Sequence, residues 1–254
     1  MKGIKKLNQL EYERLLLMSK TIVIGDVHGC IHTLKKLVRK FPKNSKLIFL
    51  GDLSNKGKYS KDVIDYVIKN NHKCLLGNHE MKIYRDFRTV LHSDKKSHIP
   101  YEDSILESPL AIQSYKKTFK ARKKMMKHLS WIESLPLYME LKVNNKKIFL
   151  THGFGLPYYE RKDKIKYAKA LYLNRYHDDS YKKEWENYSK YRVVNIFGHS
   201  VFNEVLKEKN YIGIDTGCVN GNKLTAIDLE TFKIYSQIVD SKDLIKESKE
   251  IKCI

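Results

Sequence analysis

Short apolar runs that end in glycine and a polar residue recur along the first third of the chain. Residues 21–24 precede Gly-Asp, residues 47–50 precede a second Gly-Asp, and residues 74–76 precede Gly-Asn. Apolar residues at helical spacing occupy both intervals, over 31–41 and 63–68. This β-α-β-α-β order predicts parallel strands whose carboxyl ends meet at one edge of a sheet, where α/β proteins bind their ligands.

The rest of the chain predicts one large α/β domain over residues 1–254 with two helical insertions. The insertions span about 84–130, with a loop near 93–102, and about 157–190. We expect a hairpin of residues 137–143 and 147–150 joined by Asn144-Asn145, an amphipathic helix over 5–18, and a peripheral polar tail after residue 241. Four further strands are expected, at 193–197, 211–214, 224–229 and 232–239.

The composition predicts a protein of the reducing cytoplasm. No stretch approaches the ~20 apolar residues that cross a bilayer, and charged residues interrupt the N-terminal segment, so neither a membrane partner nor export is expected. The four cysteines form no CxxC pair and no disulfide framework. Cys30 adjoins the first polar cluster, where a packing role at a helix start is favoured over a reactive thiol.

The formal net charge of +20 suggests a nucleic-acid partner, but the kind of basic residue weakens that suggestion. Only eight of the 49 basic residues are arginine, the better reader of phosphates and bases. The densest basic stretch, 116–127, has little aromatic interleaving. A solvated helix face is favoured there over a patch for nucleic acid or another acidic partner.

Six polar residues follow expected strands at positions suited to holding metal ions. They are Asp26, His28, Asp52, Asn78, His152 and His199. Carboxylate and amide oxygens and imidazole nitrogens suit hard or borderline divalent metals, and the carboxylate of Asp52 could bridge two ions. Two ions ~3.5–4 Å apart would activate a bridging water and hold both oxygens of an in-line displacement at phosphorus. His79, next to Asn78, is placed to protonate the leaving oxygen.

The remaining histidines receive a structural or surface assignment, as most single histidines would. They are His32, His72, His92, His98, His128 and His177.

The ordered motifs resemble those of the calcineurin-like metallophosphoesterases. They read GDVHG at 25–29, GDLSNKG at 51–57, GNHE at 77–80, THG at 151–153 and GHS at 198–200. Within this family the chain resembles the compact bacterial phosphoprotein-phosphatase branch, which includes symmetrical diadenosine-tetraphosphate hydrolases; residues 131–138 and 214–229 also resemble that branch.

The resemblance implies a four-layer sandwich of two mixed β-sheets flanked by helices, with two divalent ions at one sheet edge. It assigns Asp26, His28 and Asp52 to the first ion. Asp52 is shared with the second ion, whose other ligands are Asn78, His152 and His199, and Asn78 also faces the substrate phosphate. Mn, Fe and Zn all tolerate such ligands.

Two residues depart from the family's usual GDxxDRG motif. Asn55 stands where an aspartate usually orients the acid histidine, here His79, and it brings no charge. Lys56 stands where an arginine usually grips phosphate, and it provides only a point charge. Arg175 sits where the bacterial branch often has a second phosphate-binding arginine, although a surface helix position accounts for it almost as well.

These features leave three functions open. The leading interpretation is a dinuclear metal-dependent phosphatase acting on phosphoprotein serine or threonine, or on a similar monoester. The second is a hydrolase of dinucleoside polyphosphates or capped nucleotides, which the uncharged Asn55 favours because anhydride leaving groups need less protonation. The third, a non-catalytic metal-binding module, is disfavoured because the ligand set and His79 are intact.

Overall fold

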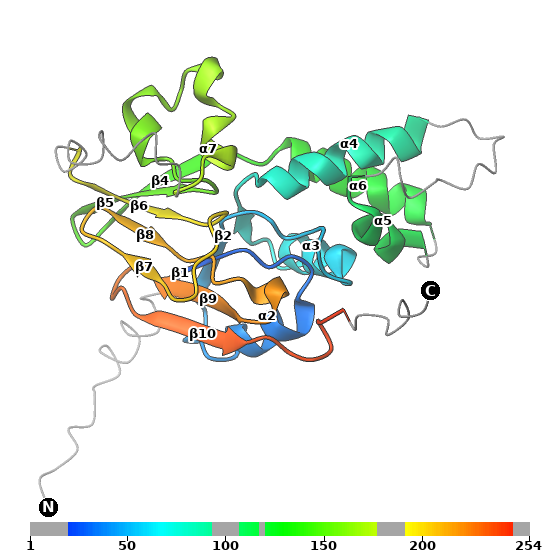
Figure 1. The fold of residues 1–254 in the computed structure, drawn as a ribbon, viewed down its shortest axis with the longest axis horizontal. Coiled ribbons are helices and arrows are strands. Elements are labelled where there is room, and N and C mark those ends of the chain that lie inside the picture. Colours follow the sequence, from blue (N-terminus) through cyan, green and yellow to red (C-terminus); the bar gives the residue numbers. More distant parts are fainter. Residues whose placement is uncertain (1–19, 93–106, 117–119, 177–190, 246–254) are drawn as a thin grey trace, which may run out of the picture.

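A computed structural model describes residues 20–92, 107–116, 120–176 and 191–245, which form two five-stranded sheets flanked by helices (Figure 1). The first sheet has the order β10-β9-β1-β2-β3, and the second has β4-β5-β6-β8-β7. Both sheets mix parallel and antiparallel pairs. The expected pair of mixed sheets is therefore confirmed.

The strand bounds follow the apolar runs closely. The strands of the first sheet are β1 (Thr21–Ile24), β2 (Lys46–Phe49), β3 (Lys73–Cys74), β9 (Lys223–Asp228) and β10 (Ile234–Ile238). Those of the second are β4 (Tyr138–Val143), β5 (Lys146–Thr151), β6 (Val193–Phe197), β7 (Leu206–Lys207) and β8 (Tyr211–Gly213). The two-residue strand β7 was not expected, because two residues are too few to display a period.

Helices cover the outer face of the first sheet, and further helices lie beside them (Figure 1). They are α2 (Ile31–Val38), α3 (Ser60–Lys69), α4 (Asn78–His92), α5 (Pro109–Lys116) and α6 (Ala121–Glu133). On the second sheet lie η2 (Leu156–Arg161), η3 (Ile165–Tyr167) and α7 (Ala170–Leu173), and η5 (Cys218–Asn220) precedes β9. None of the helices in the described ranges is both long and apolar enough to span a membrane.

The side chains of a single strand alternate between its two faces and so contribute to two layers of the core. In β1, Ile22 and Ile24 pack toward α2 and α3, whereas Val23 packs between the two sheets. Successive side chains of a strand point to opposite faces, so a strand buried on both faces is apolar throughout. The parallel register pairs Ile24 with Phe49 of β2, and this brings the residues after both strands to the same edge.

The polar stretch after residue 241, expected to be peripheral, is described only as far as residue 245, and within it Asp243 is buried. The carboxylate of Asp243 is buried and accepts hydrogen bonds from the backbone N–H and the hydroxyl of Thr33, both at 2.7 Å. The chain after residue 241 is thus anchored to α2 at its start, because a buried carboxylate needs such donors. The expected helix over 5–18 and loop near 93–102 fall in the parts that are not described.

Candidate metal and phosphate site

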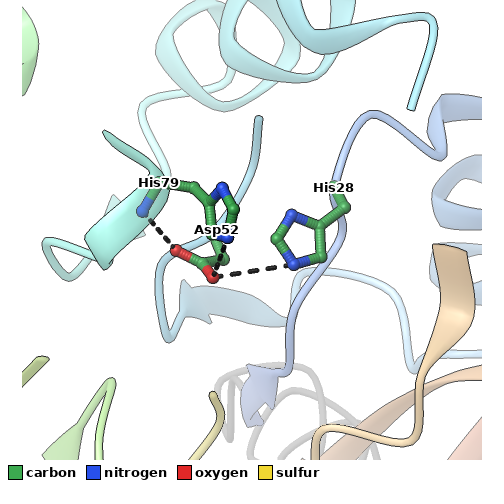
Figure 2. Close-up of side chains that lie close together, drawn as sticks. All are labelled: His28, Asp52 and His79. Atoms are coloured by element: carbon green, nitrogen blue, oxygen red, sulfur yellow. Dashed lines mark hydrogen bonds and ion pairs between the residues drawn. The ribbon is translucent and has the colours of Figure 1, made fainter. Parts of the chain in front are cut away.

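Asp52 lies at the centre of the site, on the turn that follows β2. Its side chain is buried, and one oxygen lies 3.6 Å from Nε2 of His28 and 3.9 Å from Nε2 of His79 (Figure 2). The other oxygen accepts the backbone N–H of His79 at 2.9 Å and lies 3.3 Å from Nε2 of His152. A carboxylate placed between two sets of imidazoles can bridge two cations.

The ligand atoms of two groups converge closely enough to hold a metal ion. One group is His28, Asp52 and His79, and the other is Asp52, His152 and His199; within each group the ligand atoms lie within 4.8 Å of one another. The first group contains His79, for which the sequence predicted the acid role, and neither group contains Asp26.

The imidazoles are oriented by backbone carbonyls in the manner of metal-binding histidines. Nδ1 of His28 lies 2.9 Å from the carbonyl of Ser54, and Nδ1 of His152 lies 3.0 Å from that of Leu50. A proton on each Nδ1 leaves Nε2 unprotonated and directed at Asp52, which is the tautomer that binds a cation. Nε2 of His199 instead lies 3.2 Å from the carbonyl of Leu173, which leaves Nδ1 as its ligand atom.

The structure brings Asp26 and Asn78 to the second group. The carboxylate of Asp26 is buried and accepts the backbone N–H of His199 at 3.2 Å. Oδ1 of Asn78 lies 3.0 Å from Nε2 of His152. All six residues that the sequence nominated as ligands therefore lie in one buried cluster at the carboxyl ends of strands from both sheets.

His79 is held by the residue that departs from the usual motif. Nδ2 of Asn55 lies 2.7 Å from Nδ1 of His79, and the His79 ring makes an edge contact with His28 at 4.8 Å between centroids. With the amide in this orientation Asn55 donates to Nδ1, so the proton of the neutral ring resides on Nε2, the nitrogen that faces Asp52.

Burial and the charge of the Asp52 carboxylate determine the protonation states of the residues in the site. Burial would raise the pKa of Asp52, but the nearby His152 and His28 hold it well below its usual range. Burial opposes charging of His152, yet Asp52 and Asp26 raise its pKa to about 10. A divalent cation at this place would supply the same positive charge as that proton, and metal binding releases protons from its ligands.

Two further imidazoles of the centre, His79 and His199, are neutral at pH 7. Burial lowers the pKa of His79 to about 3, with Asp52 opposing the shift and His28 adding to it. Burial also lowers the pKa of His199 to about 3, reinforced by His152 and Arg175. Neutral imidazole is the form that binds a metal.

Two cationic side chains lie at the rim. The guanidinium of Arg175 donates to the carbonyl of His199 at 3.0 Å, so this exposed arginine reaches the cluster. Lys56 is exposed next to the buried Asn55, and its charge helps to lower the pKa of both His28 and His79. Both cations are thus placed where a bound phosphate could meet them.

Sequence reasoning gave no role to two buried carboxylates that support the site. Glu80 accepts the backbone N–H groups of Asp52 and Leu53 at 2.6 and 2.8 Å, and it also accepts that of Gly77 at 3.1 Å. Asp215 accepts the N–H of Gly217 at 3.0 Å. After burial itself, the charge of Asp215 is the main reason that the pKa of Asp26 is raised. Glu80 lies in the GNHE motif three residues after Gly77, and Asp215 lies in the 214–229 stretch two residues before Gly217; those positions were the available signal.

Cys30 and three of the remaining histidines pack in the interior or against other side chains. Cys30 is buried at the start of α2. His32 makes an edge contact with Tyr59, His72 packs near Phe49, and His128 is fully buried. The side chain of residue 92 and the whole of residues 98 and 177 lie outside the described part of the chain.

The chain belongs to the calcineurin-like phosphoesterases, whose family description matches residues 19–203. This family is dimetal-dependent, and the buried carboxylate, amide and imidazole donors around Asp52 fit such a pair of divalent ions. When bound, the ions activate water and neutralise phosphate oxygens. The protein is therefore a metal-dependent phosphoric ester hydrolase, and the non-catalytic interpretation is set aside.

The proteins that resemble this chain in sequence or in fold include two tetraphosphatases and a serine/threonine phosphatase. The chain is 30% identical to the asymmetrical bis(5'-nucleosyl)-tetraphosphatase PrpE of Anoxybacillus flavithermus, over 84% of this chain and 93% of that protein. It is also 30% identical to the protein of the same name from Oceanobacillus iheyensis, over 82% and 87%. The fold is similar to that of a serine/threonine phosphatase from Saccharomyces cerevisiae, with a TM-score of 0.53, 16% identity and coverage of 87% and 80%.

Proposed function

We propose that this protein hydrolyses phosphoanhydride bonds in dinucleoside polyphosphates. The observation that carries the proposal is the contact between Asn55 and His79, in which a neutral amide stands beside the candidate acid at 2.7 Å. The names of the relatives from Anoxybacillus and Oceanobacillus support the same substrate class.

The leaving group is the reason that Asn55 bears on the substrate. Hydrolysis forms a bond from the oxygen of water to phosphorus and breaks the bond from phosphorus to the leaving oxygen. A serine alkoxide is a poor leaving group and needs a proton from His79 as the bond breaks, whereas a nucleotide phosphate departs as a stabilised anion. A carboxylate beside His79 would favour the imidazolium, but the amide of Asn55 brings no charge that would do so.

In the proposed mechanism the side chains have three roles: they bind the metal ions, bind the substrate phosphates and contact the leaving oxygen. Asp26, His28, Asp52, Asn78, His152 and His199 would hold the two ions. Arg175 and Lys56 bind oxygens of the polyphosphate from the rim, Arg175 by two parallel N–H groups and Lys56 as a point charge. His79 keeps its proton on Nε2 and donates a hydrogen bond to the leaving oxygen.

The proposed cleavage is asymmetrical, as in the names of the two relatives, rather than symmetrical as the resemblance first suggested. Diadenosine tetraphosphate would then yield ATP and AMP, whereas symmetrical cleavage would yield two ADP. The product pair therefore tests the position of attack independently of whether hydrolysis occurs.

A substrate panel with Mn²⁺ tests the proposal. The protein should hydrolyse diadenosine tetraphosphate to ATP and AMP, resolved by anion-exchange chromatography, with a kcat/KM at least about tenfold above that for a phosphoserine peptide. Asp52→Asn should abolish turnover, and Asp62→Asn, a carboxylate-to-amide change on the surface of α3, should not. Faster turnover of the phosphopeptide would instead support the monoester phosphatase.

A single substitution tests the role of Asn55. Asn55→Asp restores a carboxylate beside His79 and should raise kcat for the phosphoserine peptide by about tenfold or more, because general-acid assistance is worth ~10²–10⁴-fold. Turnover of p-nitrophenyl phosphate, which has a good leaving group, should change little. Unchanged phosphopeptide turnover in a variant that hydrolyses the aryl ester normally would contradict the assignment.

A further inference from the structure

The edge of the molecule opposite the catalytic site carries two hollows lined by basic side chains. One hollow, of about 720 Å³, is lined by Lys46, Lys73 and Lys142 among other residues. The other, of about 570 Å³, is lined by Lys146, Lys147, Arg192, Lys207 and Lys209. We call these eight exposed residues the basic edge.

The hollows adjoin each other across two turns. Asn144 lines the first hollow and Asn145 the second, and together they form the turn between β4 and β5. The side chain of Asn144 donates to the carbonyl of Glu230 at 2.9 Å, which ties this turn to the one between β9 and β10. A ligand that crosses these turns can therefore enter both hollows.

Strand direction separates the basic edge from the metal site. Lys46, Lys73 and Lys146 begin parallel strands β2, β3 and β5, whereas the candidate metal ligands follow the ends of such strands. Strands of four to six residues rise ~3.3 Å per residue, which places the edges on the order of 13–20 Å apart. A ligand at the basic edge would leave the catalytic site open.

The cations of this edge lack the carboxylate partners that several cations elsewhere in the described part of the chain have. Among the described residues, Lys36, Lys61, Arg85, Lys124, Lys162 and Lys223 make ion pairs with carboxylates. No ion pair within the described ranges involves any of the eight residues of the basic edge. Only Glu208 and Glu230 contribute carboxylates to the two linings, and Glu230 accepts the backbone N–H of Thr21 at 2.9 Å.

We infer that the basic edge binds single-stranded nucleic acid. A single phosphate could meet only a few of the eight cations, whereas a chain of phosphates that crosses the turns can meet cations of both hollows. The volumes lie within the ~300–1,000 Å³ of pockets that enclose small molecules, so a base or sugar can enter each hollow.

The remaining lining favours nucleic acid over a membrane or an acidic protein. Each lining includes an asparagine, Asn71 in the first hollow and Asn145 in the second, and an amide side chain both donates and accepts hydrogen bonds, as the edges of unpaired bases do. Interfacial binding to lipid needs apolar side chains that insert, and no large exposed hydrophobic residue of the described ranges lines either hollow.

Binding to a labelled 20-nucleotide oligoribonucleotide tests the inference. The oligonucleotide carries hydroxyl groups at both ends, so that it offers the catalytic site no terminal phosphate, and fluorescence anisotropy measures Kd from 50 to 300 mM KCl. Replacing Lys147, Arg192, Lys207 and Lys209 by glutamine should weaken binding at least about tenfold at 100 mM KCl. It should also reduce the slope of log Kd against log [KCl] by up to about 3, or ~0.7 for each phosphate that a removed cation would have neutralised.

A matched control removes the same charge from other faces. Replacing exposed Lys35, Lys123, Lys127 and Lys164 by glutamine should leave Kd within about threefold and the slope nearly unchanged. Equal weakening by both variants would show non-specific attraction and overturn the inference, as would the absence of binding by the unaltered protein.

Two further ligands identify the class of partner. Neither phosphatidylserine vesicles nor a polyglutamate peptide should compete with the oligonucleotide at equal charge concentration. Preferential binding of either one, abolished in the basic-edge variant, would overturn the assignment to nucleic acid. A matching single-stranded DNA distinguishes recognition of the phosphate chain from recognition of the 2'-hydroxyl. Unchanged thermal unfolding of both variants shows that weaker binding does not come from a failure to fold.

Discussion

Four residues of the candidate site hold a backbone conformation that side chains other than glycine seldom adopt. The φ angles of His28, Asp52, Asn55 and His199 are 45°, 49°, 89° and 61°. Such conformations cost of order 1–3 kcal/mol each and persist where the surroundings enforce them. The surroundings here are hydrogen bonds such as those from the N–H groups of Asp52 and Leu53 to Glu80. The strain places functional groups of different turns around one point.

Replacing Glu80 tests this support at the level of one residue. Glu80→Gln keeps the volume but turns one acceptor oxygen into a donor that faces backbone N–H groups, so the free energy of unfolding should fall by about 1–3 kcal/mol. Urea unfolding measures the change. Glu133→Gln, in which the original carboxylate accepts an exposed bond from Tyr84, should cost less than about 0.5 kcal/mol. Equal effects of the two substitutions would contradict the supporting role.

At the scale of elements, the turns after the strands approach one another too closely for a side chain at certain glycines. A Cβ at Gly77, between β3 and α4, would lie 2.3 Å from Oδ1 of Asp52 and 2.6 Å from Glu80. Such approaches let the loops of neighbouring strands share one buried carboxylate. The helical segments are joined differently, since the ring of His128 on α6 lies between Tyr115 of α5 and Asp65 of α3.

Gly77→Ala should damage the metal site by displacing Asp52. We expect Mn²⁺ binding, measured by isothermal titration calorimetry, to weaken by at least about tenfold. Gly221→Ala is the control because a Cβ there meets nothing within 4 Å, although its φ of 97° makes alanine cost stability. That variant should unfold at a lower temperature yet bind Mn²⁺ normally. Normal binding by Gly77→Ala would show that the turn can move without harm to the site.

The contact of three helices through His128 should be sensitive to acid. Nε2–H donates to Asp65 at 3.0 Å and Nδ1 accepts from the hydroxyl of Tyr115 at 2.6 Å, so the neutral ring is satisfied. Burial lowers the pKa of His128 to about 4, although Asp65 opposes the shift, and Lys124 and Lys127 add to it. The unfolded chain titrates near ~6.5 and binds more protons below that pH, so stability falls as the pH decreases from 6.5 to 4.

A comparison of the unaltered protein with the His128→Gln variant isolates the contribution of His128 to the pH dependence of stability. Between pH 7 and 5, the free energy of unfolding of the unaltered protein should fall by about 2 kcal/mol more than that of His128→Gln. His79 and His199 have the same sign of dependence, because burial lowers their pKa values too, but they are common to both proteins. Urea unfolding at the two pH values measures the difference, and an equal loss in both proteins would rule out His128 as its source.

At the scale of the whole molecule, the two sheets join separate halves of the site. Asp26 and Asp52 follow strands of the first sheet, whereas His152 and His199 follow strands of the second. The interior between the sheets, which includes Val23, Ile148 and Ile196, keeps these halves in register. A metal that binds residues of both sheets should therefore stabilise the entire fold.

Metal binding should raise the temperature of unfolding, and chelation should reverse the rise. At 100 times its Kd, Mn²⁺ at one site adds about 2.7 kcal/mol, which for a chain of this size corresponds to about 5–10 °C. Differential scanning calorimetry with Mn²⁺ or EDTA measures the shift. Asp52→Asn should lose most of the shift and Asp62→Asn should keep it. An identical unfolding temperature in Mn²⁺ and EDTA would argue against a structural link between metal and fold.

The spacing of apolar residues, and the turn-forming residues that bound each apolar run, made much of this structure predictable from sequence. The run over 21–24 is strand β1 as expected, and the hairpin around Asn144-Asn145 is confirmed with bounds shifted by about one residue. Helix α4 begins at Asn78, inside the GNHE motif, because the polar residue after a strand also starts the next helix. Strand β7 could not be predicted because two residues are too few to display a period, and the anchoring of Asp243 could not because its partner, Thr33, is distant in sequence.

What the sequence by itself determined is the identity and order of the chemical groups. Residue types next to glycine after apolar runs nominated the ligands, His79 and the unusual Asn55, because those types have the required donors and the strands have a fixed direction. Only the tertiary structure decided how the groups meet: that Glu80 supports Asp52, that Asn55 contacts Nδ1 of His79, and that scattered lysines gather at the basic edge. Those outcomes depend on the packing of two sheets, which brings together residues that no local pattern connects.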